Sequence, residues 1–303
     1  MLGLPLPAMC RFKPLLLRFG LPAFAVLLPG AAMAFPPAPF YTLFGMIRDE
    51  NGQTLRVDGA QVVFYRNGAE LFRQTIGQTE KLDQNYQLRL RMDMLRSGTR
   101  TYTDLATNTG VDFHLSVMIH NVSYQPIEMN MPRTVGKPGE RLRLDLTLGV
   151  DGDGDGLPDA WEESQLYAGG HLPDENGWDL ELLDRDGDFD KDGVSNWDEY
   201  VAGTYATDAT DYLRLEIMAR MASHVRLQFY SIHGKSYALE SSSDLKNWTP
   251  EPLFLRDPES TDSDDIADPA KSQAGWTADS TGVIDVFAAS GETAGIFYRL
   301  KVQ

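Results

Sequence analysis

Two twelve-residue stretches have aspartate at positions 1, 3 and 5 and glycine at position 6. The first runs from Asp151 to Glu162 and the second from Asp188 to Glu199. Both fit the calcium-loop pattern D-x-[DN]-x-[DN]-G-x5-E without a mismatch. Loop positions 1, 3 and 5 give side-chain oxygens, position 7 a main-chain carbonyl, position 9 a ligand that often acts through water, and position 12 a bidentate glutamate. The predicted metal ligands are Asp151, Asp153, Asp155, Leu157, Asp159 and Glu162 in the first loop, and Asp188, Asp190, Asp192, Val194, Asn196 and Glu199 in the second.

The acidity of the chain is concentrated in this segment. Residues 151–199 hold 17 acidic residues against Arg185 and Lys191, a balance of -15 in a chain whose net charge is -17. Such a local concentration indicates a metal cage, and it argues against nucleic-acid binding, which needs a basic face. The alternative is a solvated acidic linker that never orders around a metal.

Residues 1–34 have the pattern of a secretory signal peptide. Three basic residues between positions 11 and 18 precede a short apolar stretch at 19–28, and Ala32-Met33-Ala34 has the A-x-A form of a cleavage site. The apolar stretch is too short for a membrane anchor, and it contains Pro22 and is followed by Pro29. We therefore expect a protein that is secreted or at the cell surface after cleavage near Ala34, with no membrane span in the mature chain.

The length and the cysteine content fit this expectation. The 303 residues are enough for two or three domains. The single cysteine, Cys10, lies in the predicted leader, so the mature protein would have neither a disulfide nor a thiolate metal site. An exported chain that lacks disulfides and would be stabilised by calcium instead is more typical of a bacterial protein.

Residues 35–149 have the features of a β-sandwich of about six or seven short strands. Apolar and polar residues alternate at 86–91, 112–119 and 142–148, which is the period of half-buried strands. A first strand is predicted at 40–48, and Asn67-Gly68 between two apolar runs predicts a hairpin.

The beginning of this domain resembles a known family. The run from Gly45 to Gly52 (GMIRDENG) and the run from Asp58 to Val62 (DGAQV) resemble the carboxypeptidase-regulatory or transthyretin-like sandwich. The resemblance covers about the first third of the domain. It implies a structural or adhesive accessory module.

Residues 150–210 form the predicted calcium segment. Apolar residues at helical spacing follow each loop, at 157–168 before Gly169-Gly170 and at 197–201 before Gly203. Because no helix precedes either loop, these units resemble thrombospondin type 3 repeats and dockerin-like modules more than helix-loop-helix hands. The cysteines of those families are absent, and the loops lie 37 residues apart, which is longer than in a dockerin. Asp184 and Asp186 are candidates for a further ion.

Residues 211–303 have the features of a second β-sandwich. The run from Gly234 to Trp248, together with Phe297-Tyr298-Arg299-Leu300, resembles a β module found at the C-termini of exported bacterial proteins. A polar, acidic stretch at 257–274 is expected to be an exposed loop. The predicted strands are 212–217, 225–230, 236–240, 282–287 and 296–302.

Motifs of other chemistries are missing from the sequence. The five histidines include no H-E-x-x-H pair, and neither a G-x-S-x-G elbow nor a glycine-rich nucleotide loop occurs. We therefore expect a secreted calcium-binding structural or interaction protein rather than an enzyme. Calcium would order the joint between two β domains, and surface glycans or proteins would be its adhesion partners. The alternatives are a polysaccharide-active enzyme or its carbohydrate-binding accessory, and a dockerin-like assembly module.

Overall fold

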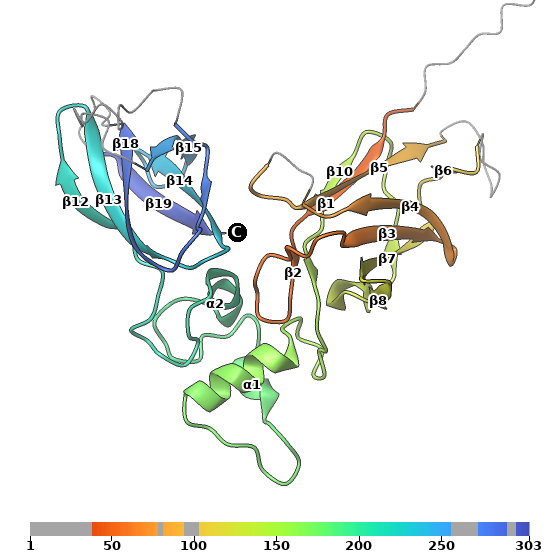
Figure 1. Cartoon of the computed structure of the whole chain (residues 1–303), viewed down its shortest axis with the longest axis horizontal. Coiled ribbons are helices and arrows are strands. Elements are labelled where there is room, and N and C mark those ends of the chain that lie inside the picture. Colours follow the sequence, from red (N-terminus) through yellow and green to blue (C-terminus); the bar gives the residue numbers. More distant parts are fainter. Residues whose placement is uncertain (1–37, 78–80, 94–102, 256–271, 290–294, 303) are drawn as a thin grey trace, which may run out of the picture. The chain divides into compact units, whose positions relative to one another are not determined.

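Strands make up most of the regular structure of this protein (Figure 1), and the described part of the chain contains two α-helices. The prediction of a mainly β fold is thus confirmed. The predicted leader at 1–34 and most of the predicted loop at 257–274 lie outside the described residues. The computed structural model describes residues 38–77, 81–93, 103–255, 272–289 and 295–302.

The first β region consists of two main sheets that share one core. One sheet has the order β10-β1-β5-β6, the other has the order β4-β3-β7-β8 with β9 also paired to β7, and β11 and β2 form a separate pair. Leu43, Leu88, Phe64 and Leu115, two from each main sheet, are all fully buried in this core. The strands are β1 (Tyr41–Gly45), β2 (Ile47–Arg48), β3 (Gln61–Arg66), β4 (Ala69–Thr75), β5 (Tyr86–Met92), β6 (Ala106–Thr107), β7 (Asp112–Ile119), β8 (Val122–Tyr124), β9 (Arg133–Thr134), β10 (Arg141–Arg143) and β11 (Leu146–Thr147), with a 3-10 helix at Ile127–Met129.

Two continuous strands predicted in this region are each broken in the structure. The run at 40–48 divides into β1 and β2 at Met46, and the run at 142–148 divides into β10 and β11. Asp145 explains both breaks, because its Oδ1 accepts a hydrogen bond from the main-chain N–H of Met46 at 3.0 Å. Its other oxygen pairs with the buried guanidinium of Arg48 at 3.4 Å. A side chain therefore replaces main-chain pairing at this point.

The predicted hairpin is present between β3 and β4. Asn67 and Gly68 both have positive φ angles, 50° and 78°. Two consecutive left-handed residues give the type I′ turn, whose twist matches the twist of the strands it joins. Asparagine and glycine are the residues that adopt this conformation most readily.

The second β region again has two sheets around one core. One sheet has the order β12-β13-β18-β16, with β12, β13 and β18 side by side (Figure 1), and in the other β14 pairs with β15, β17 and β19. The strand predicted at 212–217 begins only at Glu216. Leu213 and Leu215 pack against the core without pairing, so their alternation reports burial and not a strand. The strands are β12 (Glu216–Arg220), β13 (His224–Ser231), β14 (Ser236–Ser242), β15 (Thr249–Glu251), β16 (Leu253–Phe254), β17 (Trp276–Thr277), β18 (Gly282–Ala289) and β19 (Phe297–Val302).

A third, small core lies in the segment between the two β regions. Its buried members include Leu157, Trp161, Leu183 and Tyr200, and Trp161 meets Tyr200 edge to face at 5.5 Å. The elements here are α1 (Asp159–Ala168), a 3-10 helix η2 (Leu180–Leu183) and α2 (Asn196–Ala202). The stretch Pro37–Gln303, which holds all three cores, forms one compact unit. Of the helices among the described residues, none is long and apolar enough to cross a bilayer.

Candidate metal centre

The first acidic loop is folded into a tight cage. Ligand oxygens of Asp151, Asp153 and Asp155 all lie within 4.8 Å of one another. Oδ1 of Asp151 accepts a hydrogen bond from the N–H of Gly154 at 2.7 Å, and Oδ1 of Asp155 accepts one from Leu157 at 2.6 Å. Gly154 and Gly156 have φ angles of +86° and +99°. This left-handed backbone turns the chain around the three carboxylates.

The second loop repeats this geometry with different residues. Ligand oxygens of Asp188, Asp190 and Asp192 lie within 4.8 Å of one another. Oδ1 of Asp188 accepts from the N–H of Lys191 at 2.8 Å, and Oδ1 of Asp192 accepts from Val194 at 2.7 Å. These are the same loop positions that are bonded in the first loop. The two triplets could each hold a metal ion.

Position 9 of each loop braces the loop. Oδ1 of Asp159 accepts from the N–H of Gly152 at 2.6 Å, and Oδ1 of Asn196 accepts from Phe189 at 3.2 Å. The Asn196 amide also donates to the carbonyl of Asp184 at 2.7 Å. Asp159 lies outside the group of carboxylates within 4.8 Å, as a ligand that acts through water would.

Glutamate at position 12 is the least satisfied group in each loop. Glu162 and Glu199 are both 0% exposed. Neither oxygen of Glu162 has a hydrogen-bond partner, nor does Oε2 of Glu199. Burial, reinforced by the charges of the neighbouring aspartates, raises the pKa of Glu162 to about 9 and that of Glu199 to about 8. A buried carboxylate without a partner is costly, and a cation between it and the triplet would supply the partner.

The donor set indicates which class of cation fits. The side chains offered are carboxylates, and no nitrogen or sulfur ligand belongs to either described group. Hard oxygen donors suit calcium, magnesium and manganese and do not suit copper or zinc. The main-chain carbonyls of Leu157 and Val194 stay predicted ligands that would complete the set.

Each helix begins at its loop and positions the last ligand. Ser195 caps α2, since its hydroxyl accepts from the N–H of Asp198 at 3.2 Å and donates to the Asp198 carboxylate at 2.9 Å. Helix α1 follows Pro158, whose extended backbone precedes the first turn. Both glutamates lie in the first turn of their helix, where the helix dipole favours negative charge.

Arg185, which lies between the two loops in the sequence, contacts both of them. The N–H of Arg185 donates to Oδ2 of Asp155 at 2.6 Å, and the Arg185 guanidinium lies 3.8 Å from the ring centre of Trp197. Asp153, Asp155, Glu181 and Asp184 line a cavity of about 410 Å³ between the first loop and η2. Glu181 carries no motif signal and could not be found from the sequence. Asp186, the other predicted extra ligand, is not among the lining residues.

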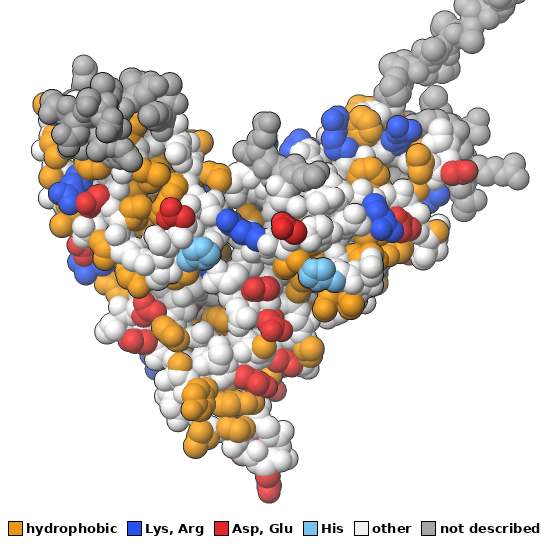
Figure 2. Space-filling view, in the orientation of Figure 1, with side chains coloured by type: hydrophobic (Ala, Val, Ile, Leu, Met, Phe, Trp, Pro, Cys, Tyr) orange, Lys and Arg blue, Asp and Glu red, His pale blue; other side chains and the backbone are white. Residues whose placement is uncertain are grey.

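Acidic side chains gather over the segment that contains α1 and α2, whereas basic side chains lie mainly over the strands (Figure 2). The charge pattern on the visible face therefore follows the charge count along the chain. A cation approaching this segment meets a concentrated negative field.

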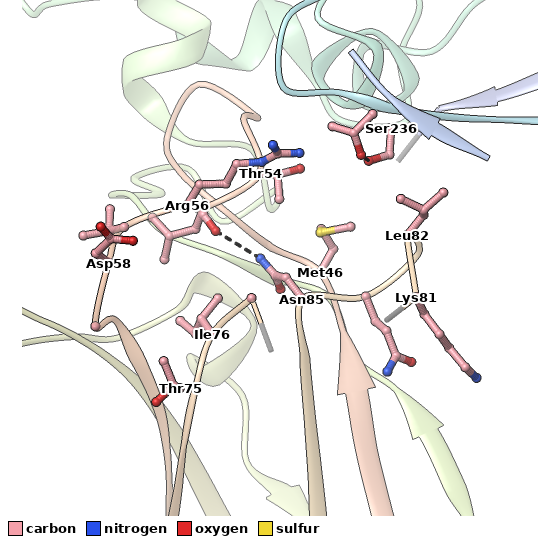
Figure 3. A pocket seen from close by; sticks show the side chains of 16 residues that line it. Met46, Thr54, Arg56, Asp58, Thr75, Ile76, Lys81, Leu82, Asn85 and Ser236 are labelled. Carbon is pink, nitrogen blue, oxygen red and sulfur yellow. Dashed lines mark hydrogen bonds between the residues drawn. The ribbon is translucent and has the colours of Figure 1, made fainter. Parts of the chain in front are cut away.

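A second concave site is lined mainly by loops of the first β region, with Ser236 of β14 and Thr277 of β17 at one side (Figure 3). It has a volume of about 570 Å³ and is lined by residues that include Arg56, Asp58 and Lys81. The buried Asn85 amide donates to the carbonyl of Leu55 at 3.4 Å and so braces one wall. Asp58 is the single carboxylate among the lining residues. Glycoside hydrolysis needs two carboxylates, and the described residues that line this pocket supply one.

Lys191 gives a direct test of the loop geometry. It adopts a φ of +67° at the position where the first loop has Gly154. We expect Lys191→Gly to raise the free energy of unfolding by about 1 kcal/mol, because glycine has no Cβ to strain this backbone. Lys191→Ala removes the same charge and keeps the strain. Equal stability of the two variants in chemical denaturation would contradict this explanation.

Comparison with known proteins gives no relative. No family model, no curated protein and no solved structure matches this chain. The geometry of the two loops therefore carries the functional inference.

Proposed function

We propose that this protein binds calcium at both loops and that calcium orders the segment between its two β regions. The observation that carries the proposal is the buried glutamate at position 12 of each loop, beside three carboxylates held in the same hydrogen-bonded turn. Both carboxylate oxygens of Glu162 and one oxygen of Glu199 have no hydrogen-bond partner. Two independent loops with different sequences have this arrangement. A solvated acidic linker has no reason to bury one carboxylate in each repeat.

Calcium is favoured among the hard cations. It takes six to eight oxygen ligands in a flexible cage, and a bidentate glutamate at position 12 helps to reach that number. Magnesium demands a near-ideal octahedron and keeps several waters. Extracellular calcium modules bind in roughly the 10⁻⁴ to 10⁻³ M range. That range fits the predicted export of this chain. Outside the cell, calcium would be present throughout and would act as a structural ion.

The role of the metal is structural in this proposal. Both loops lie next to the small core of Leu157, Trp161 and Tyr200, so ordering the loops orders this core. A chain held in this way outside the cell would serve adhesion to surface glycans or proteins. The enzyme and dockerin-like alternatives stay open, and among the described residues no particular observation favours either.

Thermal unfolding with and without calcium tests the proposal. A metal that binds the folded form alone adds about 1.4 kcal/mol per site at a concentration ten times its dissociation constant. We expect a clear rise in melting temperature in millimolar calcium relative to EDTA, and a smaller rise in equal magnesium. Fluorescence of Trp161 and Trp197, which lie in the first turns of the two helices, should change with the same calcium dependence. Identical melting curves in calcium and EDTA would refute the structural role.

A further inference from the structure

Lys235 is a fully buried cation whose partners come from other parts of the chain. Its side chain is 0% exposed. The ammonium donates to the carbonyl of Gly52 at 2.6 Å and to the carbonyl of Tyr200 at 3.2 Å. Gly52 lies in the connection between β2 and β3, Tyr200 lies in α2, and Lys235 directly precedes β14. One side chain therefore contacts both β regions and the metal segment.

The bond to Tyr200 satisfies the end of a helix. The last carbonyls of a helix have no partner within it, and a cation at this end is favoured by the helix dipole. Helix α2 ends at Gly203, whose φ is +85°. A Cβ at Gly203 would lie 3.0 Å from Ile232 and 3.2 Å from Cε of Lys235, so the β13–β14 turn packs closely on this helix end.

The bond to Gly52 anchors a turn of the first β region, residues 49–53. Gly52 has a φ of +75°, and a Cβ there would lie 2.4 Å from the carbonyl oxygen of Tyr200. The Tyr200 hydroxyl donates to the carbonyl of Asp49 in the same turn at 2.7 Å. In addition, Arg56 donates to the carbonyl of Gly234 at 3.1 Å. Turn 49–53 is thus hydrogen-bonded both to α2, through Tyr200, and to the β13–β14 turn, through Lys235.

This junction is adjacent to a metal ligand. Tyr200 directly follows Glu199, the predicted bidentate ligand of the second loop. We propose that Lys235 couples metal binding in the second loop to the docking of the C-terminal strands on turn 49–53. The inference rests on the proposed function. It adds that metal binding in the second loop affects residues outside that loop through Tyr200 and Lys235. With metal bound, Glu199 fixes α2 and keeps the Tyr200 carbonyl in reach of Lys235. Without metal, α2 loses its anchor and the lysine loses one of its two acceptors.

Hydrogen exchange of main-chain amides, with and without calcium, tests this coupling in the intact protein. In the wild type we expect calcium to slow exchange in the two loops and also in turn 49–53 and residues 232–235, by about fivefold or more, the lower end of typical coupling. In Lys235→Met, which keeps the buried aliphatic stem, calcium should still protect the loops but not the two turns. The matched control is Lys246→Met, since Lys246 is an exposed lysine of the same β region.

Binding affinity gives a second measurement, because coupling between two processes is reciprocal. Lys235→Met should weaken calcium binding at the second loop by about fivefold or more, and Lys246→Met should leave it unchanged. Gly52→Ala, which pushes the turn away from Tyr200, should weaken it similarly. Loops protected by calcium while both turns stay unprotected in the wild type would overturn the coupling and leave the proposed function standing. Loops that calcium does not protect would refute both.

Discussion

We expect Glu162→Gln to remove calcium binding at the first loop while leaving the metal-free protein folded. Loss of an outer-shell group alone typically costs 10- to 100-fold in metal affinity, so we expect a loss of at least about 100-fold for this direct ligand. At pH 7 the metal-free stability should barely change, because the pKa of the buried Glu162 is about 9 and its carboxyl is already neutral there. Calorimetric titration and parallel melts in EDTA measure the two quantities.

The neighbouring Glu163 supplies the control for this experiment. It is one residue away and exposed, so Glu163→Gln makes the same substitution without touching the predicted cage. We expect its affinity to stay within a few-fold of the wild type, since an exposed charge is screened by solvent. Equal losses in the two variants would show that the loop attracts calcium by bulk charge and not by coordination.

The second large effect is an opposite response to pH with and without metal. In the metal-free protein, burial raises the pKa of Glu162 to about 9 and of Glu199 to about 8, against an unfolded value of 4.5. The folded state then binds more protons than the unfolded state between these values. Stability in EDTA should therefore be greatest at acidic pH and fall as pH rises from about 5 to 9.

We expect calcium to reverse this trend, because a bound cation would favour the carboxylate form of both glutamates. The stabilisation by calcium should be small near pH 5 and largest near pH 9. Binding at pH 7 should release close to one proton from each glutamate, which calorimetry in two buffers of different ionisation enthalpy measures. Binding heats that are independent of the buffer would contradict the assignment of these glutamates as ligands.

Much of the metal segment follows from local sequence rules. The alternation of aspartates, the glycine at position 6 and the helical spacing after each loop placed the two triplets and both helices correctly, because such turns depend on residues close in the chain. The hairpin at Asn67-Gly68 was predictable for the same reason. The identity of the bound ion and the ligand role of each residue stay predictions.

The features that local rules missed depend on distant partners. The strand breaks at Met46 and Leu144 arise from Asp145, a residue about 100 positions from one of them. Lys235 looks like an ordinary turn lysine in the sequence, and its burial depends on Gly52 and Tyr200. Asn196 matches position 9 of the motif, yet its amide is bonded to the main chain of Phe189 in the loop and of Asp184 outside it. Each case needs tertiary contacts that no periodicity reports.

Calorimetric titration of the wild-type protein with calcium tests the central claim most directly. If both loops bind calcium, we expect saturable binding of two ions per chain. The dissociation constants should lie in roughly the 10⁻⁴ to 10⁻³ M range of extracellular modules, or below it. We also expect Glu162→Gln to lose one of the two bound ions and Glu199→Gln to lose the other. An absence of saturable binding at millimolar calcium would contradict the central claim, and the acidic segment would then be a charged connection between the two β regions.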